Sequence, residues 1–304
     1  MSDDSNQLTA AKAGAFLIGK ELFVNRLGYG AMRLTGQPGN FGRYPDWEAG
    51  QKLLRRAVEL GVNLIDTAEA YGPGFNEDLI ASALHPYSPD TIIATKGGIN
   101  KPAPDNIQAD GRPENLRRGC EASLQRLKVE QIALYQLHRP DPKVPLAESV
   151  GMLATLRQEG KIRHVGLSNV TVEQIEQARQ IVPIASVQNR LSIADRTEER
   201  VLDYCTQHEI AFIPYSSLGA HPQRRGFPLA TAEGTLAEVA QRHGVKPNQI
   251  ALAWMLHRAQ NILLIPGTTT IEHLEENIAA AAIKLTEEEI QLLSSNSTVS
   301  LAQN

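Results

Sequence analysis

The sequence is poor in cysteine and in aromatic residues, with two cysteines in 304 residues and an aromatic fraction of 5%. Cys120 and Cys205 lie far apart in segments with helical periodicity. We expect them to be small core residues in a reducing compartment rather than a disulfide or a metal pair, and we expect no metal site. The sequons at Asn169 and Asn296 are then chance matches.

Long hydrophobic runs are also missing. None approaches the roughly 20 apolar residues that are needed to span a bilayer. The polar start MSDDSNQLTAAKAG lacks the apolar core of a signal peptide, so the expected location is the cytoplasm. We expect one domain over residues 1–304, with residues 1–14 as a flexible terminus.

Positive charge is not in excess, because 30 Lys and Arg residues stand against 34 Asp and Glu residues. The resulting net charge of -4 predicts neither a nucleic acid nor an anionic membrane as a partner. The hydrophobic fraction of 42% and charged fraction of 21% are those of an ordinary globular protein with a substantial core. Nothing in the sequence specifies an oligomeric state.

Short apolar segments rich in Ile, Val and Leu alternate with longer amphipathic segments. Near-continuous apolarity is typical of parallel strands that are covered on both faces. A preceding stretch, AFLIGKELFVNRLG, predicts a hairpin that turns at Gly19-Lys20. The predicted strands are residues 28–32, 62–67, 91–96, 132–138, 163–169, 185–189, 211–216 and 261–267.

Helix signals fill the connections between these strands. The segment WEAGQKLLRRAVELG carries an apolar stripe that ends at Gly61, and Pro113 opens a second helix. Capping-box patterns predict three further helix starts, at Thr171, Thr235 and Thr286.

Eight alternations of strand and helix predict an α/β fold, a closed (β/α)₈ TIM barrel whose N-terminal end is capped by the hairpin. Connections 97–113 and 217–234 follow strands and are rich in Gly, Pro and polar residues, so we expect surface loops on the catalytic face. An open doubly wound sheet is the alternative. It lacks support because no GxGxxG turn follows any strand, and Arg33 stands where the third glycine would be.

Three successive predicted strands end in ionisable side chains, Asp66, Lys96 and His138, and Tyr71 follows the first of them. Each alone is typical of a solvated strand end, but neighbouring strand ends meet around one rim of a barrel. A lysine ammonium stabilises a phenolate, and an aspartate supplies the counter-charge that a buried lysine needs. A histidine can hydrogen-bond a carbonyl oxygen. The four residues therefore predict a unit that gives a proton to a carbonyl during hydride transfer.

Seven segments of this chain resemble those of the aldo-keto reductase family, in family order. The resemblance covers nearly the whole chain and implies a (β/α)₈ barrel that carries out NAD(P)(H)-dependent reduction of aldehydes or ketones. It implies that Tyr71 is the general acid/base and that Lys96 lowers its pKa, while Asp66 pairs with Lys96 and His138 positions the carbonyl. The segments are DTAEAYG, ATKGG, YQLHRPDP, GKIRHVGLSN, VQN, PYSSLG and IPGTTTIEHLEEN.

The same resemblance implies a site for NADP(H), with NAD(H) as the alternative. Ser168, Asn169 and Gln188 correspond to residues that hold the nicotinamide carboxamide, and Tyr215 to the ring that stacks on it. Without the family, the SN and QN pairs would be assigned to turns and Tyr215 to the core. The other implied contacts are Gly30, Met32, Asp66, Ser216, Leu218, Gly219, Pro266, Gly267, Thr268, Thr269, His273, Glu276 and Asn277.

Two positions depart from the family pattern at the adenosine end. Many members have lysine where this chain has Gly267 and arginine where it has His273. The loss of both charges weakens the case for a 2′-phosphate. The threonine hydroxyls, the helix start and Arg225 can still hold that group, so NADPH remains the expected cofactor.

The substrate is expected to be a small carbonyl compound. Its shape must depend on residues 33–44 and on the loops after Lys96 and Ser217, since the chain lacks the long C-terminal loop of some family members. The stretch NRLGYGAMRLTG resembles bacterial pyridoxal-reductase-like members, which makes pyridoxal a candidate.

Two alternative functions remain. One is a cofactor-binding regulatory subunit of the potassium-channel β type, which keeps the same four residues. The first 14 residues are too short and too polar to suggest an inactivation gate. The other is a phosphate-binding barrel isomerase or aldolase with a Schiff base at Lys96, which would leave Tyr71, His138 and Tyr215 unexplained.

Overall fold

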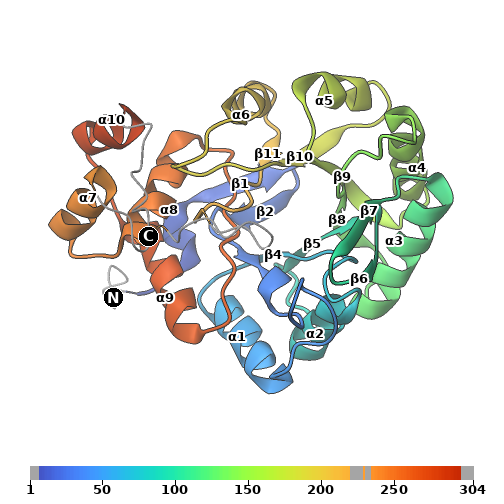
Figure 1. The fold of residues 1–304 in the computed structure, drawn as a ribbon, viewed down its shortest axis with the longest axis horizontal. Coiled ribbons are helices and arrows are strands. Elements are labelled where there is room, and N and C mark those ends of the chain that lie inside the picture. The colour runs from blue at the N-terminus through green and yellow to red at the C-terminus, as the bar shows by residue number, and fades with distance from the viewer. Residues whose placement is uncertain (1–6, 220–228, 230–233, 296–304) are drawn as a thin grey trace.

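A parallel sheet curves through the centre of the computed structural model, with helices around its outside (Figure 1). The structure describes residues 7–219, 229 and 234–295. The strand order is β11-β10-β9-β8-β5-β4-β3, so strands that follow one another in the sheet are linked through outer helices. The strands are β3 (Tyr29–Gly30), β4 (Leu64–Asp66), β5 (Ile92–Gly97), β8 (Ile132–Leu137), β9 (Ile162–Ser168), β10 (Ile184–Gln188) and β11 (Ala211–Phe212).

The eighth predicted strand, 261–267, closes the barrel through single bridges instead of a continuous strand. Phe212 of β11 bridges Ile262, and Leu27 bridges Leu264, both in the parallel sense. The amide of Gly28 donates to the carbonyl of Leu264 at 2.7 Å. Pro266 has no N–H to extend this ladder, which limits its length. The predicted closed barrel is confirmed, with its first and last strands shorter than expected.

The helices begin largely where the sequence predicts. Thr171 and Thr286 each accept a hydrogen bond from the backbone N–H three residues later. The helix predicted at Thr235 also begins there, but its N-cap is Gly234, whose φ of 76° is one that glycine adopts without strain. The helices are α1 (Trp47–Glu59), α2 (Phe75–Leu84), α3 (Pro113–Leu127), α4 (Leu146–Gln158), α5 (Val172–Arg179), α6 (Glu199–Gln207), α7 (Thr235–His243), α8 (Pro247–Arg258), α9 (Ile271–Ala279) and α10 (Glu287–Ser295).

The predicted hairpin, β1 (Ala15–Ile18) and β2 (Leu22–Asn25), turns through Gly19 and Lys20, which both have positive φ. Its inward side chains join a second apolar cluster inside the barrel. The barrel members of this cluster come mostly from the starts of the strands, so the hairpin covers the N-terminal end as expected. The cluster comprises Ile18, Leu22, Val24, Leu64, Ile92, Ala94, Leu134, Ala185, Ala211, Ile213 and Leu263.

The start of the chain contains a short helix. A 3₁₀ helix, η2 (Ala10–Ala13), packs against the barrel, and the amide of the fully buried Ala10 donates to the carbonyl of Leu60 at 2.8 Å. Four residues of the expected flexible terminus over 1–14 therefore form a helical turn against the barrel, and their small side chains let the backbone approach closely.

The connection 97–113 is also not the plain loop that was expected. β6 (Ile99–Ala103) and β7 (Asn106–Ala109) pair antiparallel as a hairpin on the catalytic face. Ile99 and Lys101 are buried while Asn100 is exposed, which is the alternation of a half-buried strand. Most of the second expected loop, 217–234, lies outside the described residues, as does Arg225.

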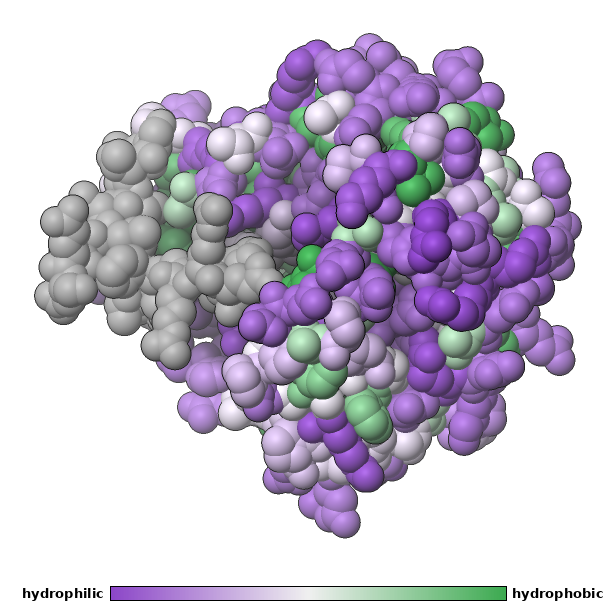
Figure 2. Space-filling model, turned by 45° about the vertical axis from the view of Figure 1, so that its right-hand side comes forward, coloured by the Kyte–Doolittle hydropathy of each residue, from purple (hydrophilic) through white to green (hydrophobic). Residues whose placement is uncertain are grey.

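Hydrophilic side chains cover most of the described surface in the view of Figure 2, with small apolar areas between them. Among the described residues, no helix has the length and apolar character that a bilayer crossing demands. Cys120 and Cys205 are buried and unbridged, which agrees with the core role expected of both.

Candidate active site

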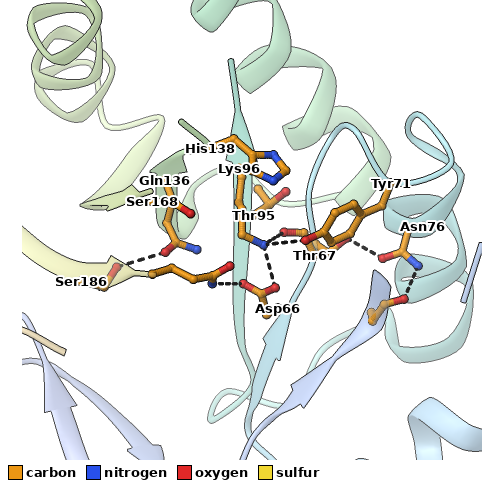
Figure 3. Close-up of polar contacts among 12 residues, drawn as sticks. Asp66, Thr67, Tyr71, Asn76, Thr95, Lys96, Gln136, His138, Ser168 and Ser186 are labelled. Atoms are coloured by element: carbon orange, nitrogen blue, oxygen red, sulfur yellow. Dashed lines mark hydrogen bonds and ion pairs between the residues drawn. The ribbon is translucent and has the colours of Figure 1, made fainter. Parts of the chain in front are cut away.

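The predicted ionisable residues meet at the carboxyl ends of the strands (Figure 3). Asp66 is the last residue of β4, Lys96 lies near the end of β5, and His138 directly follows β8. These strands are neighbours in the sheet, in the order β8-β5-β4. Tyr71 comes from the turn after β4 and points its phenol toward Lys96.

Lys96 is the centre of the site. Its Nζ donates to Asp66 Oδ2 at 2.7 Å, to the carbonyl of Thr67 at 2.8 Å and to Tyr71 Oη at 3.3 Å. The side chain is fully buried, and an ammonium has three protons to give. Each proton therefore has an acceptor, and the buried charge has its counter-ion in Asp66.

The charge states of this pair follow from burial and from their mutual contact. Burial lowers the pKa of Lys96, but the Asp66 carboxylate and the Tyr71 phenol together outweigh burial and raise that pKa above its usual value. Burial raises the pKa of Tyr71, and the ammonium of Lys96 opposes that rise. At neutral pH the site therefore holds an ammonium next to a neutral phenol, which is a proton donor.

His138 supplies a neutral imidazole. Burial, and then the positive charges of Lys96, Arg139 and Lys101, hold the pKa of His138 well below its usual range. Its ring stands edge-on to that of Tyr71, with centroids 5.9 Å apart. Nδ1 is buried without a hydrogen-bond partner in the described part of the chain. A neutral ring can give one N–H to an oxygen placed beside the phenol.

The turn that carries Tyr71 is held from several sides. Thr67 Oγ1 donates to Asn76 Oδ1 at 2.7 Å, and Asn76 Nδ2 donates at 2.9 Å to the carbonyls of Ala31 and Leu34. Asn76 is fully buried in the first turn of α2. This role was not predicted from the sequence. The available signal was the polar Asn76 close to the apolar, buried Leu79 and Ile80 of the same helix.

A second missed residue is Lys101, on the inward side of β6. Its Nζ donates to the carbonyls of Gly39 and Asn40 in the preceding loop, the latter at 2.9 Å. The carbonyl of Asn40 also accepts from the amide of Gly72, next to Tyr71, at 3.1 Å. Lys101 thereby fastens the β6–β7 hairpin to residues 36–42 beside the phenol.

The residues expected near the nicotinamide also come together. Asn169 Nδ2 donates to the carbonyl of His138 and to Ser168 Oγ, both at 3.0 Å, and Tyr215 Oη donates to Asn169 Oδ1 at 2.8 Å. Gln188 does not join this cluster through its amide N–H. Its Nε2 donates to Asp66 Oδ1 at 2.8 Å instead.

This donor set suits a carboxamide. Ser168 Oγ accepts from Asn169, so its own O–H remains to donate. Gln188 Oε1 makes no hydrogen bond within the described residues, so it remains an acceptor. A carboxamide presents one carbonyl and one NH₂ group, which are the complements of that donor and that acceptor.

The loop expected to bind the adenosine phosphate crosses β3 at close range. A Cβ added to Gly267 would lie 2.7 Å from the carbonyl oxygen of Gly30, and one added to Gly30 would lie 2.5 Å from that of Ile265. Tyr29 Oη donates to the carbonyl of Thr268 at 2.6 Å and fixes the loop. Backbone crowding therefore explains why position 267 has no side chain, lysine included.

The remaining implied cofactor residues lie in the 3₁₀ helix η3 (Ala31–Arg33), in the turn after β11, and in α9 and the segment before it. Thr270 caps α9 by accepting from the amide of His273 at 3.3 Å, and His273 itself is exposed. Glu276 is paired with Lys246. The amide of Gly219 donates to the carbonyl of Ser216 at 2.8 Å, which forms a turn after β11. Asn277 and Pro266 are buried, Thr269 is exposed, and Met32 and Leu218 are half-buried.

Comparison with known proteins supports this interpretation. The aldo/keto reductase family matches residues 26–297. The chain is 44% identical over 284 residues to an uncharacterized oxidoreductase of Schizosaccharomyces pombe, covering 93% of this chain and 90% of that protein. It is 40% identical over 278 residues to pyridoxine 4-dehydrogenase of Escherichia coli, covering 89% and 94%. A Klebsiella pneumoniae aldo-keto reductase solved in complex with NADPH superposes with a TM-score of 0.76 at 26% identity, covering 92% and 94%.

The chain therefore belongs to the aldo/keto reductase family and is an oxidoreductase. The family and barrel that the seven segments imply are confirmed. The similarity to pyridoxine 4-dehydrogenase also supports the expected relation to pyridoxal-reductase-like members.

Proposed function

We propose that the protein reduces aldehydes or ketones to alcohols with NADPH, and that Tyr71 is the general acid/base. The observation that carries this proposal is the buried Lys96 ammonium. It is neutralised by Asp66 at 2.7 Å and directs another proton at Tyr71 Oη. Such a contact stabilises the phenolate that remains after Tyr71 has given up its proton.

The four residues divide the proton chemistry between them. His138 gives an N–H to the carbonyl oxygen and orients it beside Tyr71. Tyr71 delivers its phenolic proton to that oxygen as negative charge develops there, and Lys96 holds the phenolate. In the direction of alcohol oxidation, Tyr71 takes the proton back. A nicotinamide cofactor, when bound, supplies or accepts the hydride.

NADPH is the proposed cofactor, with NAD(H) as the alternative. A relative with the same fold was solved with NADPH. The missing lysine at position 267 can be replaced from the 3₁₀ helix after β3, η3 (Ala31–Arg33), because Arg33 Cγ lies 4.0 Å from where a Gly267 Cβ would be. Arg33 is exposed next to the loop that Tyr29 fixes. We infer that its guanidinium and the hydroxyls of Thr268 and Thr269 hold the 2′-phosphate.

Pyridoxal is the proposed substrate among small carbonyl compounds. Support comes from the 40% identity to a protein named pyridoxine 4-dehydrogenase, which covers 94% of that protein. The two buried cysteines support a reducing, cytoplasmic location.

The direct test mixes purified protein with NADPH or NADH and a panel of aldehydes that includes pyridoxal, and follows the loss of reduced-cofactor absorbance. We expect turnover, with a higher kcat/KM for NADPH than for NADH. NADPH binding without oxidation by any aldehyde would contradict the reductase proposal and favour a regulatory subunit.

The Tyr71→Phe variant tests the assigned acid. It keeps the ring but removes the phenolic proton, so we expect turnover to fall by about 10²–10⁴-fold. Binding of NADPH, measured by quenching of protein fluorescence, should stay close to that of the wild-type protein. Unchanged turnover would show that another group gives the proton.

A further inference from the structure

The Asp66 carboxylate has one partner on each oxygen. Oδ2 accepts from Lys96 at 2.7 Å, and Oδ1 accepts from Gln188 Nε2 at 2.8 Å. Asp66 and Gln188 are each only 3% exposed, so these bonds lie in a low-dielectric interior where they are strong. The group of Gln188 that faces Asp66 must be its NH₂, because a carboxylate can only accept.

The contact spans the interior of the barrel. Gln188 ends β10 and Asp66 ends β4, and three other strands separate these two in the sheet. The two residues are 122 positions apart in the chain. Local packing along one strand therefore does not produce this bond. It exists because the closed barrel brings the ends of distant strands together.

We propose that Gln188 is a positioning residue for proton transfer, which orients the Asp66 carboxylate and so connects the nicotinamide-binding residues to Lys96 and Tyr71. This inference rests on the proposed function and goes beyond a contact with the cofactor. An N–H on Oδ1 draws part of the carboxylate charge away from Lys96. The ammonium is then less compensated and stabilises the Tyr71 phenolate more strongly.

The same amide can serve both sites. Nε2 is committed to Asp66, while Oε1 makes no hydrogen bond within the described residues. A nicotinamide N–H received by Oε1 leaves Nε2 in place, because the two ends of an amide point in different directions. The charged and titratable groups that face Tyr71 in this unit are Asp66 from β4, Lys96 from β5, His138 after β8 and Tyr215 after β11.

The variant Gln188→Met tests the proposal, since it keeps a long side chain but removes the N–H donor. The first readout is the NMR signal of Tyr71 in protein labelled with ¹³C at tyrosine Cζ, assigned by its absence in Tyr71→Phe. Ionisation of a phenol moves this signal downfield, so at a pH near the pKa of Tyr71 a weaker bond from Lys96, which raises that pKa, leaves less phenolate and a signal shifted upfield. We expect that upfield shift in Gln188→Met at fixed pH.

The matched control is Ser168→Ala, which removes another proposed carboxamide contact but does not touch Asp66. Its Tyr71 signal should coincide with that of the wild-type protein. Should Gln188→Met fail to fold, Gln188→Leu removes the same donor with a smaller side chain. A Tyr71 signal that does not move in the folded variant would overturn the proposal.

Kinetics give the second readout. At saturating NADPH we expect kcat of Gln188→Met to fall by about tenfold or more, with the pH profile of kcat moved to higher pH. An increase in KM for NADPH, with kcat and its pH profile unchanged, would show that Gln188 only contacts the cofactor and would contradict the positioning role. The NMR result does not need turnover, so failure of the reductase proposal and failure of this one are distinguishable.

Discussion

At the scale of the residue, individual charged side chains next to β5 define this site. Lys96 points into the barrel toward Asp66, and its neighbour Thr95 lies on the other face of the strand. There Thr95 Oγ1 donates at 2.6 Å to Glu77, a fully buried carboxylate that also accepts from Arg126 at 2.7 Å. β5 therefore contributes Lys96 to a buried ion pair on one side and contacts the Glu77–Arg126 ion pair through Thr95 on the other, so each buried charge has a partner, as burial requires.

A third carboxyl in this region, that of Glu69, makes a contribution to folding stability that depends on pH. Burial raises the pKa of Glu69 to about 6 from an ordinary 4.5, and its Oε2 lies against Gly119 of α3. A raised pKa in the folded state means that the contribution to stability is full below pH 4.5 and is lost as pH rises through about 6.

We therefore expect Glu69→Gln to be more stable than the wild-type protein at pH 8, by up to about 2 kcal/mol. Near pH 4.5 the two proteins should be nearly equal. Urea denaturation at both pH values measures this, with Glu130→Gln at an exposed site as the control. A stability difference that does not change with pH would contradict the assignment.

At the scale of the element, short hairpins at the two ends of the barrel have separate tasks. The β6–β7 hairpin joins the catalytic face through Lys101 and its bonds to residues 39 and 40. The β1–β2 hairpin fills the opposite end with Ile18, Leu22 and Val24. This division places chemistry and stability on different faces of the barrel. Variants of the β1–β2 hairpin should therefore alter the stability of the protein without altering the active site.

Ile18→Ala should lower the free energy of unfolding by about 2–5 kcal/mol, because it leaves a cavity at the end of the barrel. Leu17→Ala is the matched control on the same strand, since Leu17 is 49% exposed and should change stability by about 0.5 kcal/mol at most. Both values come from urea denaturation followed by circular dichroism. Equal effects in the two variants would show that the hairpin does not plug the barrel.

At the scale of the whole molecule, the guanidinium of Arg26 connects the first and last strand segments of the barrel. Arg26 is almost fully buried and donates to the carbonyls of Leu256 at 2.7 Å, Ala259 at 2.5 Å and Ile262 at 3.2 Å, which belong to the end of α8 and to the closing segment. Its own carbonyl accepts from the amide of Leu264. The barrel therefore closes through a side chain as well as through backbone bridges.

Arg26→Met should destabilise the protein by about 3 kcal/mol or more, because several buried carbonyls lose their donors at once. In this variant, the amides of Gly28 and Leu264, whose hydrogen bonds close the barrel, should exchange with deuterium faster than the amides inside β8. Arg55→Met, at an exposed site on α1, is the control and should change neither quantity. Unaltered exchange at the closure in Arg26→Met would assign the closure to the backbone alone.

Sequence reasoning predicted those features that depend on local pattern. The eight apolar segments, the turn at Gly19-Lys20 and the caps at Thr171 and Thr286 each depend on residues within one turn or strand. The helix start at Thr235 is also confirmed, although Gly234 and not Thr235 is the N-cap. Sequence reasoning failed at 97–113, where packing against residues 36–42 orders a polar segment, an event that local signals cannot report.

The sequence by itself determined the alternation of strands and helices, and it placed Asp66, Lys96 and His138 at strand ends, because period and position are local properties. Only the tertiary structure decided that Gln188 reaches Asp66 from across the barrel and that the Gly30 carbonyl excludes a side chain at Gly267. Both depend on the close approach of segments far apart in the chain. That approach is set by closure of the barrel, not by the identity of neighbouring residues.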